Sequence, residues 1–144
     1  MKNKNFRCFL LLSVFCLVCL LGCEQSNVPV SGKVTFEDGT AITSGEIIFA
    51  LENADEYFAK GKIEKDGTYS LTEYTVGKGS KPGCRKGNFK VFIASTSTSI
   101  ISDDGTKTET THIIDQGYTN KDQTPLKATV PGGVYDFKVP PYKK

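Results

Sequence analysis

Apolar and polar residues alternate along much of the chain after residue 28. The clearest case is the segment 30–36, in which Val30, Gly32, Val34 and Phe36 alternate with polar residues. A period of two residues is typical of a strand with one buried face and one polar face. Similar patterns predict further strands at 47–51, 58–63, 69–71, 89–93, 126–130 and 135–139.

Short turn motifs separate the predicted strands. Asp-Gly-Thr at 38–40 follows the first strand, and Lys-Asp-Gly-Thr at 65–68 lies between two later ones. Asp and Gly suit tight turns because they tolerate a positive φ. We therefore expect residues 58–63 and 69–71 to pair as a hairpin around the second turn.

Two apolar residues depart from the simple alternation. Ile48 and Phe92 point to the face opposite the main apolar positions of their strands, and Ile48 implies some extra cover there. No stretch beyond the first 23 residues has helical apolar spacing over three turns. About seven short strands separated by turns predict an all-β fold, a single sandwich of two antiparallel sheets.

Several segments, spread over nearly the whole predicted sandwich, resemble a known family. They are VSGKV (30–34), DGT (38–40), SGEIIF (44–49), DGTYSL (66–71), KGNFKV (86–91), YTN (118–120) and TPL (124–126). These motifs resemble carboxypeptidase-regulatory-like and transthyretin-like domains, above all the small lipoproteins of planctomycete-type bacteria. The resemblance implies an Ig-like or transthyretin-like sandwich, and it implies no activity, because its motifs are turns and core positions.

The start of the chain has the regions of a bacterial export signal. Lys2, Lys4 and Arg7 give a positive beginning, and a mostly apolar run follows over residues 8–21. This run is shorter than the about 20 apolar residues of a membrane-spanning helix and fits the apolar region of a signal peptide. It ends in Leu-Leu-Gly-Cys at 20–23, which resembles the lipobox of bacterial lipoproteins.

The lipobox motif predicts cleavage between Gly22 and Cys23 and a lipid on the Cys23 thiol, because a thiolate forms a stable thioether. Glu24, in place of an aspartate that signals inner-membrane retention, favours the outer membrane. The alternative is an ordinary signal peptide or membrane anchor with a coincidental cysteine. The expected organisation is a signal peptide (1–22), a lipidated tether (23–27) and a β-sandwich domain (28–144).

The net charge of +2 depends on the signal peptide. Without its three basic residues, the chain has 15 basic and 16 acidic residues and no basic stripe. This charge distribution argues against nucleic acid as a partner. The expected membrane contact comes instead from the lipid on Cys23.

Two residues are candidates for chemistry. Cys84 has no intramolecular partner if Cys23 carries lipid, and its neighbours Arg85 and Lys86 favour a reactive thiolate in an accessible loop. An incidental unpaired thiol is the other interpretation. His112 is the only histidine, and a single histidine is more often a packed or solvated residue than a base or metal ligand.

These residues leave two functional hypotheses open. The first is a non-catalytic envelope module, with no cofactor or metal, that binds an envelope protein or a glycan or has a structural role. The second is an exported hydrolase or redox protein that uses His112 or Cys84. Transthyretin-like hydroxyisourate hydrolases end in Tyr-Arg-Gly-Ser, whereas this chain ends in Pro-Pro-Tyr-Lys-Lys. The polar segment 95–124 predicts an extended hairpin or flap, and 97–111 is where we expect a ligand.

Overall fold

The computed structural model describes residues 26–54, 56–75, 77, 79–94, 97–101, 108–132 and 134–143, without the side chains of 97–101 and 108–111. This part of the chain is built of strands and one short 3-10 helix, η1 (Gln116–Tyr118), which confirms the all-β prediction. The strands are β1 (Ser31–Phe36), β2 (Glu46–Leu51), β3 (Tyr57–Lys62), β4 (Thr68–Ser70), β5 (Thr72–Thr75), β6 (Gly79–Pro82), β7 (Gly87–Ala94), β8 (Ser97–Ile101), β9 (Thr108–His112), β10 (Lys127–Val130) and β11 (Phe137–Val139).

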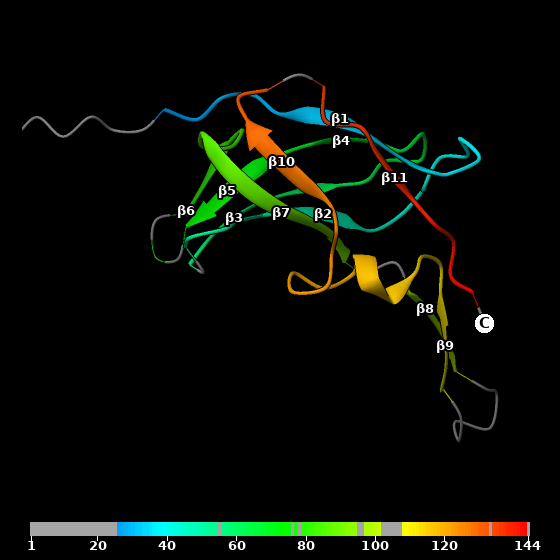
Figure 1. Ribbon diagram of the computed structural model, residues 1–144. Coiled ribbons are helices and arrows are strands. Elements are labelled where there is room, and N and C mark those ends of the chain that lie inside the picture. Colours follow the sequence, from blue (N-terminus) through cyan, green and yellow to red (C-terminus); the bar gives the residue numbers. More distant parts are fainter. Residues whose placement is uncertain are drawn as a thin grey trace, which may run out of the picture.

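Two sheets lie face to face and form the expected sandwich (Figure 1). The larger sheet has six strands in the order β10-β7-β2-β3-β5-β6, and all its neighbours are antiparallel. The smaller sheet has three strands in the order β11-β1-β4. Here β1 and β4 are antiparallel, but β1 and β11 are parallel. The antiparallel prediction is therefore confirmed for the other strand pairs and wrong for this one, which joins strands that no single turn connects.

Inward-facing residues of both sheets form one hydrophobic core. At its centre Phe49 meets the rings of Tyr69, Phe89, Tyr135 and Phe137, with centroids 5.9–6.3 Å apart. Tilted and edge-on aromatic pairs of this kind contribute roughly 0.5–1.5 kcal/mol each beyond the area that they bury. Other fully enclosed residues come from the predicted apolar positions, among them Val34, Ile47, Val91, Ile93, Val130 and Val139.

The predicted hairpin around residues 65–68 was wrong in its pairing. The turn forms, because Gly67 donates its N–H to the Glu64 carbonyl at 2.9 Å. The strand that follows, β4, pairs with β1 in the smaller sheet, and the chain returns to β3 only as β5. Gly61 permits the passage between sheets, because a Cβ there would collide with the Ser70 carbonyl.

The segment 83–86 closes one end of the sandwich. It connects β6 to β7, and three strands of the same sheet separate these two, so the segment crosses the end of that sheet. We call it the crossing segment. Cys84 lies within this crossing segment and pairs with Val28, through hydrogen bonds of 2.8 and 2.9 Å. Gly83 lies so close to the Val28 carbonyl that a Cβ would collide with it. The first residues of the described chain therefore enter the fold at this end.

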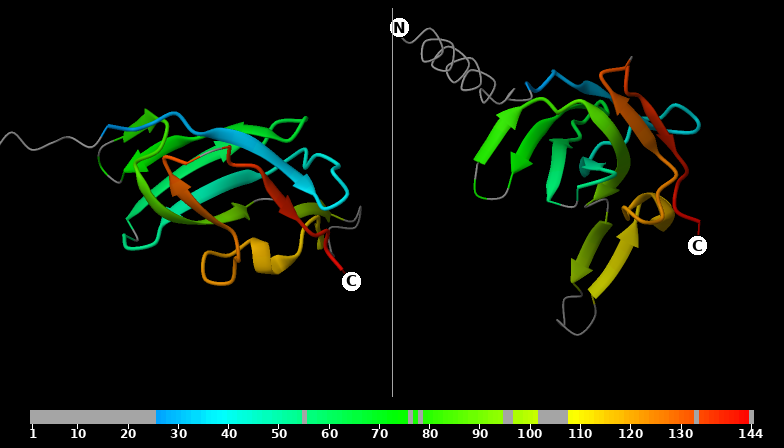
Figure 2. Two further views of the ribbon diagram at one scale, coloured as in Figure 1. Left: turned by 45° about the horizontal axis from the view of Figure 1, so that its top comes forward. Right: turned by 60° about the vertical axis from the view of Figure 1, so that its left-hand side comes forward.

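The hairpin β8–β9 projects from the opposite end of the molecule (Figures 1 and 2). Its backbone pairing confirms the extended hairpin predicted within residues 95–124. Ile114 fixes its base, because this side chain is fully buried and its backbone bridges to Pro141. Among the described residues no helix has both the length and the apolar character needed to cross a membrane.

Candidate functional site

A polar cluster lies under the crossing segment. Glu73 faces the core from β5 and is only 3% exposed. Arg85 reaches it from the crossing segment and donates from Nε and Nη2 to the same oxygen, Oε1, at 3.0 and 2.7 Å. The Arg85 guanidinium also lies 4.4 Å from the centroid of the Tyr57 ring. The backbone N–H of Arg85 donates to the Tyr57 hydroxyl at 3.0 Å. This arrangement fixes the path of the chain between β6 and β7.

The charges in the cluster are balanced by these contacts. Burial alone raises the pKa of Glu73, but hydrogen bonds and the positive charge of Arg85 outweigh it, so the pKa lies below its ordinary value. Thr75 donates a further hydrogen bond to Oε1 at 3.1 Å. The second carboxylate oxygen, Oε2, is buried without a hydrogen-bond partner in the described structure. Glu73 therefore remains ionised at neutral pH, paired with Arg85.

The structure contradicts the accessible position on which the predicted reactivity of Cys84 depends. The side chain is completely buried rather than accessible. Its burial raises the pKa of the thiol to about 11, and the negative charge of Glu73 works in the same direction. Arg85 acts in the opposite direction, but its guanidinium is directed at Glu73. A protonated and enclosed thiol has neither the charge nor the access that a reactive cysteine requires.

His112 lies far from this cluster in the fold. It ends β9 at the hairpin, and its ring centroid is 5.4 Å from that of Tyr142. Cys84 lies at the other end, beside the chain entry. The structure therefore does not bring the two candidate residues together. Among the described residues no group of three His, Cys, Asp or Glu side chains is arranged to hold a metal ion.

Two adjoining grooves follow the edge of the smaller sheet. One has a volume of about 520 Å³ and is lined by charged and hydroxyl side chains that include Lys33, Lys62 and Asp136. The other, about 300 Å³, is mainly apolar and begins at the chain entry. The two share Ser31 and Ser70. Both are open to solvent, and the Asp136 carboxylate is already engaged by the Lys33 backbone N–H at 2.8 Å.

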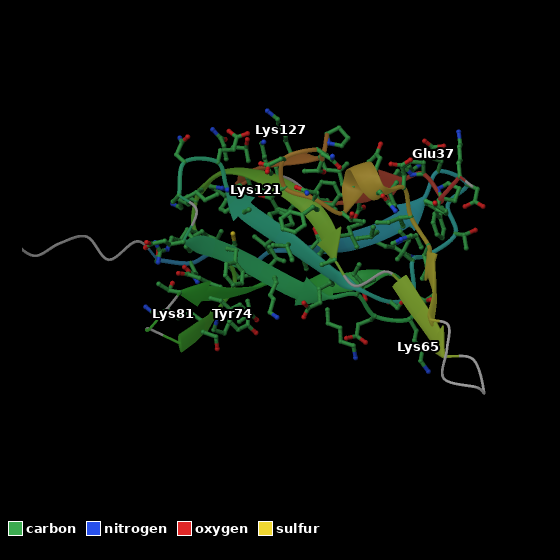
Figure 3. The ribbon with its side chains drawn as sticks, turned by 90° about the horizontal axis from the view of Figure 1, so that it is seen from below. Glu37, Lys65, Tyr74, Lys81, Lys121 and Lys127 are labelled. Carbon is green, nitrogen blue, oxygen red and sulfur yellow. The ribbon has the colours of Figure 1, made fainter. Side chains whose placement is uncertain are left out.

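The solvent side of the six-stranded sheet, which we call the outer face, carries the second feature that can bind a ligand. Cross-strand partners in an antiparallel sheet share a face, so the register defines its members. Figure 3 views the molecule from this side, with Tyr74 near one edge and Lys127 near the other. The outer face comprises Glu46, Ile48, Ala50, Phe58, Lys60, Lys62, Thr72, Tyr74, Ser80, Pro82, Asn88, Lys90, Phe92, Ala94, Lys127 and Thr129.

Sequence reasoning noticed only part of the outer face. The outward positions of Ile48 and Phe92 were anticipated, but β5 was not, so Tyr74 was missed. The sequence pattern of β5 (Thr72–Thr75) is hard to recognise as a strand because its inward residue is a glutamate. An alternation that treats Glu as outward reverses the two faces of this strand.

The predicted signal peptide, the Gly22–Cys23 cleavage site and the lipidation of Cys23 lie outside the described residues. The described chain starts at Ser26, and Asn27 donates from Nδ2 to the Pro82 carbonyl at 3.3 Å. This contact joins the predicted tether to the end of β6, next to the crossing segment. Comparison of the chain with protein-family models, with curated proteins and with solved structures gave no match.

Proposed function

We propose that this chain is a lipid-anchored, non-catalytic binding module of the bacterial cell envelope. Cys23 carries the lipid, residues 23–27 form the tether, and the sandwich binds an envelope protein or a glycan. The anchor holds the module to a membrane, with the outer membrane favoured by Glu24. Two or three acyl chains give stable attachment, whereas a single chain binds only marginally.

The observation that carries this proposal is the position of the chain entry. Val28 joins the fold at the crossing segment, and the hairpin β8–β9 lies at the opposite end (Figures 1 and 2). A lipid a few residues before Val28 brings the crossing-segment end close to the membrane. The outer face and the hairpin then remain accessible to soluble or polymeric partners.

The anchor is tested by comparing the full chain with its Cys23→Ala variant in a host that processes lipoproteins. We expect the parent protein to enter the detergent phase and to have the mass of a chain that starts at a diacylated or triacylated Cys23. The variant should lack this mass. A mature terminus elsewhere, or an unmodified Cys23, would refute the anchor.

The binding role is tested by crosslinking in intact cells. We expect one reproducible envelope component to be captured by the parent protein and, equally, by His112→Ala. Loss of function on removal of the His112 side chain alone would favour the exported hydrolase instead. Absence of any captured component, with the protein correctly anchored, would contradict a binding role.

A further inference from the structure

The outer face has a continuous row of side chains that runs across five strands. Lys127, Lys90, Ala50, Phe58 and Tyr74 are successive cross-strand partners on β10, β7, β2, β3 and β5. With strands about 4.8 Å apart, four spacings give a length of roughly 19 Å. The row is therefore long enough to contact several units of a polymer.

Two aromatic rings lie at one end of this row, on the solvent side of the sheet and outside the hydrophobic core. Phe58 and Tyr74 are stacked, with centroids 6.0 Å apart and an interplanar angle of 14°. They project away from the core and remain partly exposed. In the adjacent row, Ile48 and Phe92 are also partly exposed cross-strand partners. Apolar groups gathered on a solvated sheet face are typical of a contact surface.

Positive charge predominates on the same face. Its lysines are Lys60, Lys90 and Lys127, with Lys62 at the margin beside the larger groove. Its carboxylates are Glu46 and, at the other margin, Glu52. Lys60 pairs with Glu46 at 3.1 Å and lies 5.2 Å from the centroid of the Tyr74 ring. Lys127 pairs with Glu52 at 3.4 Å. Both carboxylates are thus engaged, and the excess of two lysines gives a positive surface within a nearly neutral domain.

We propose that the outer face binds an acidic polysaccharide whose sugars bear carboxylates, an inference that rests on the proposed binding function and names its surface and ligand class. The apolar faces of sugar rings stack on Phe58 and Tyr74, and the carboxylates pair with lysines along the row. Lys90 lies centrally and has no ion pair among the described residues, so it takes the first carboxylate.

The same composition disfavours a protein as the partner. Lysine is depleted from the centres of protein interfaces, whereas here Lys90 lies between the stacked aromatic pair and the far edge of the sheet. A polyanionic sugar chain requires no large apolar area, because its charges and hydroxyl groups stay partly hydrated. Charge complementarity therefore decides in favour of the polysaccharide.

The test uses the full lipid-anchored protein in detergent micelles, titrated with oligomers of galacturonic acid. Neutral gluco-oligosaccharides of the same length are the control ligand. We expect binding of the acidic oligomer alone, weakened by salt, because exposed charges are screened at about 8 Å in 0.15 M salt. Lys90→Gln should raise the Kd about fivefold, and Tyr74→Ala should raise it about tenfold or more. Lys138→Gln, an exposed lysine on β11 in the other sheet, should leave the Kd unchanged.

Three results would overturn the inference. They are equal affinity for the neutral oligomer, an unchanged Kd in both Lys90→Gln and Tyr74→Ala, and sedimentation showing a dimer that Tyr74→Ala dissociates. Lys90→Gln removes only an outward charge, so it keeps the test valid if Tyr74→Ala unfolds. If galacturonate does not bind while in-cell crosslinking still captures an envelope component, this inference fails and the proposed function stands. Failure of both the titration and the capture contradicts both.

Discussion

The buried thiol of Cys84 gives a quantitative prediction about its chemical reactivity. The perturbation is a thiol reagent at pH 8, applied to a soluble form that starts at Ser26, in which Cys84 is the sole cysteine. The buried core residues of the described structure lie within this form, from Val30 onward. We expect native Cys84 to react far more slowly than it does in the unfolded chain.

The magnitude follows from the pKa and from enclosure. A pKa of about 11, against the reference value of 9.0, lowers the thiolate fraction at pH 8 about 100-fold. The side chain is also 0% exposed, so the reagent has to wait for the structure to open. Reaction through local opening is limited in a comparable way, because the open form of a closed core is rare. The native rate should therefore be at least about 100-fold below the rate in denaturant.

The assay is mass spectrometry of the labelled protein over time, with and without denaturant. A matched control places an exposed thiol on the edge strand β6, as Ser80→Cys in a Cys84→Ala background. The control should react in the native state at nearly its unfolded rate. Native labelling of Cys84 within about tenfold of its denatured rate would refute the buried assignment and restore the reactive-loop interpretation.

Two further predictions concern stability. Glu73→Gln should lower the free energy of unfolding by about 2–3 kcal/mol at pH 7 in urea titrations, because it leaves Arg85 without its buried partner. The pKa of Glu73 is depressed in the fold, so the carboxylate contributes fully to the free energy of unfolding above its unfolded pKa near 4.3. This contribution is lost as the pH falls further. A stability difference between parent and variant that stays constant down to pH 2 would contradict this. Gly32→Ala should cost about 2–3 kcal/mol, because its Cβ would collide with the Tyr135 carbonyl that accepts the Tyr69 hydroxyl at 2.6 Å. A thermal melt like that of Ser31→Ala, an exposed neighbour, would argue against this clash.

The alternation of apolar and polar residues predicted where most strands lie, but not which strands pair in the sheets. The seven predicted segments correspond to β1, β2, β3, β4, β7, β10 and β11. Each has apolar residues at every second position, which only one face of a strand can bury. The parallel pairing of β1 with β11 was not predictable, because it joins segments about 100 residues apart and has no turn motif to indicate it.

Sequence reasoning missed the strands β5 and β6, each for its own reason. The strand β6 is exposed at all four of its residues, so it has no apolar alternation. The strand β5 directs Glu73 inward, against the usual preference of a carboxylate for water. Only the partner Arg85, from a different segment, makes this burial acceptable. The same pairing engages the Arg85 guanidinium with Glu73 rather than with the Cys84 thiol.

The parallel pair of β1 and β11 determines how the molecule would bear mechanical load. A pull on its N-terminal end first strains the isolated bridge between Val28 and Cys84, which has two hydrogen bonds. The force then passes along β1, which is bonded to β4 on one edge and to β11 on the other. Bonds loaded along a strand are sheared together rather than peeled one at a time. Forced unfolding is governed by the unfolding rate, and tension applied at this terminus loads both ladders of β1 along the strand.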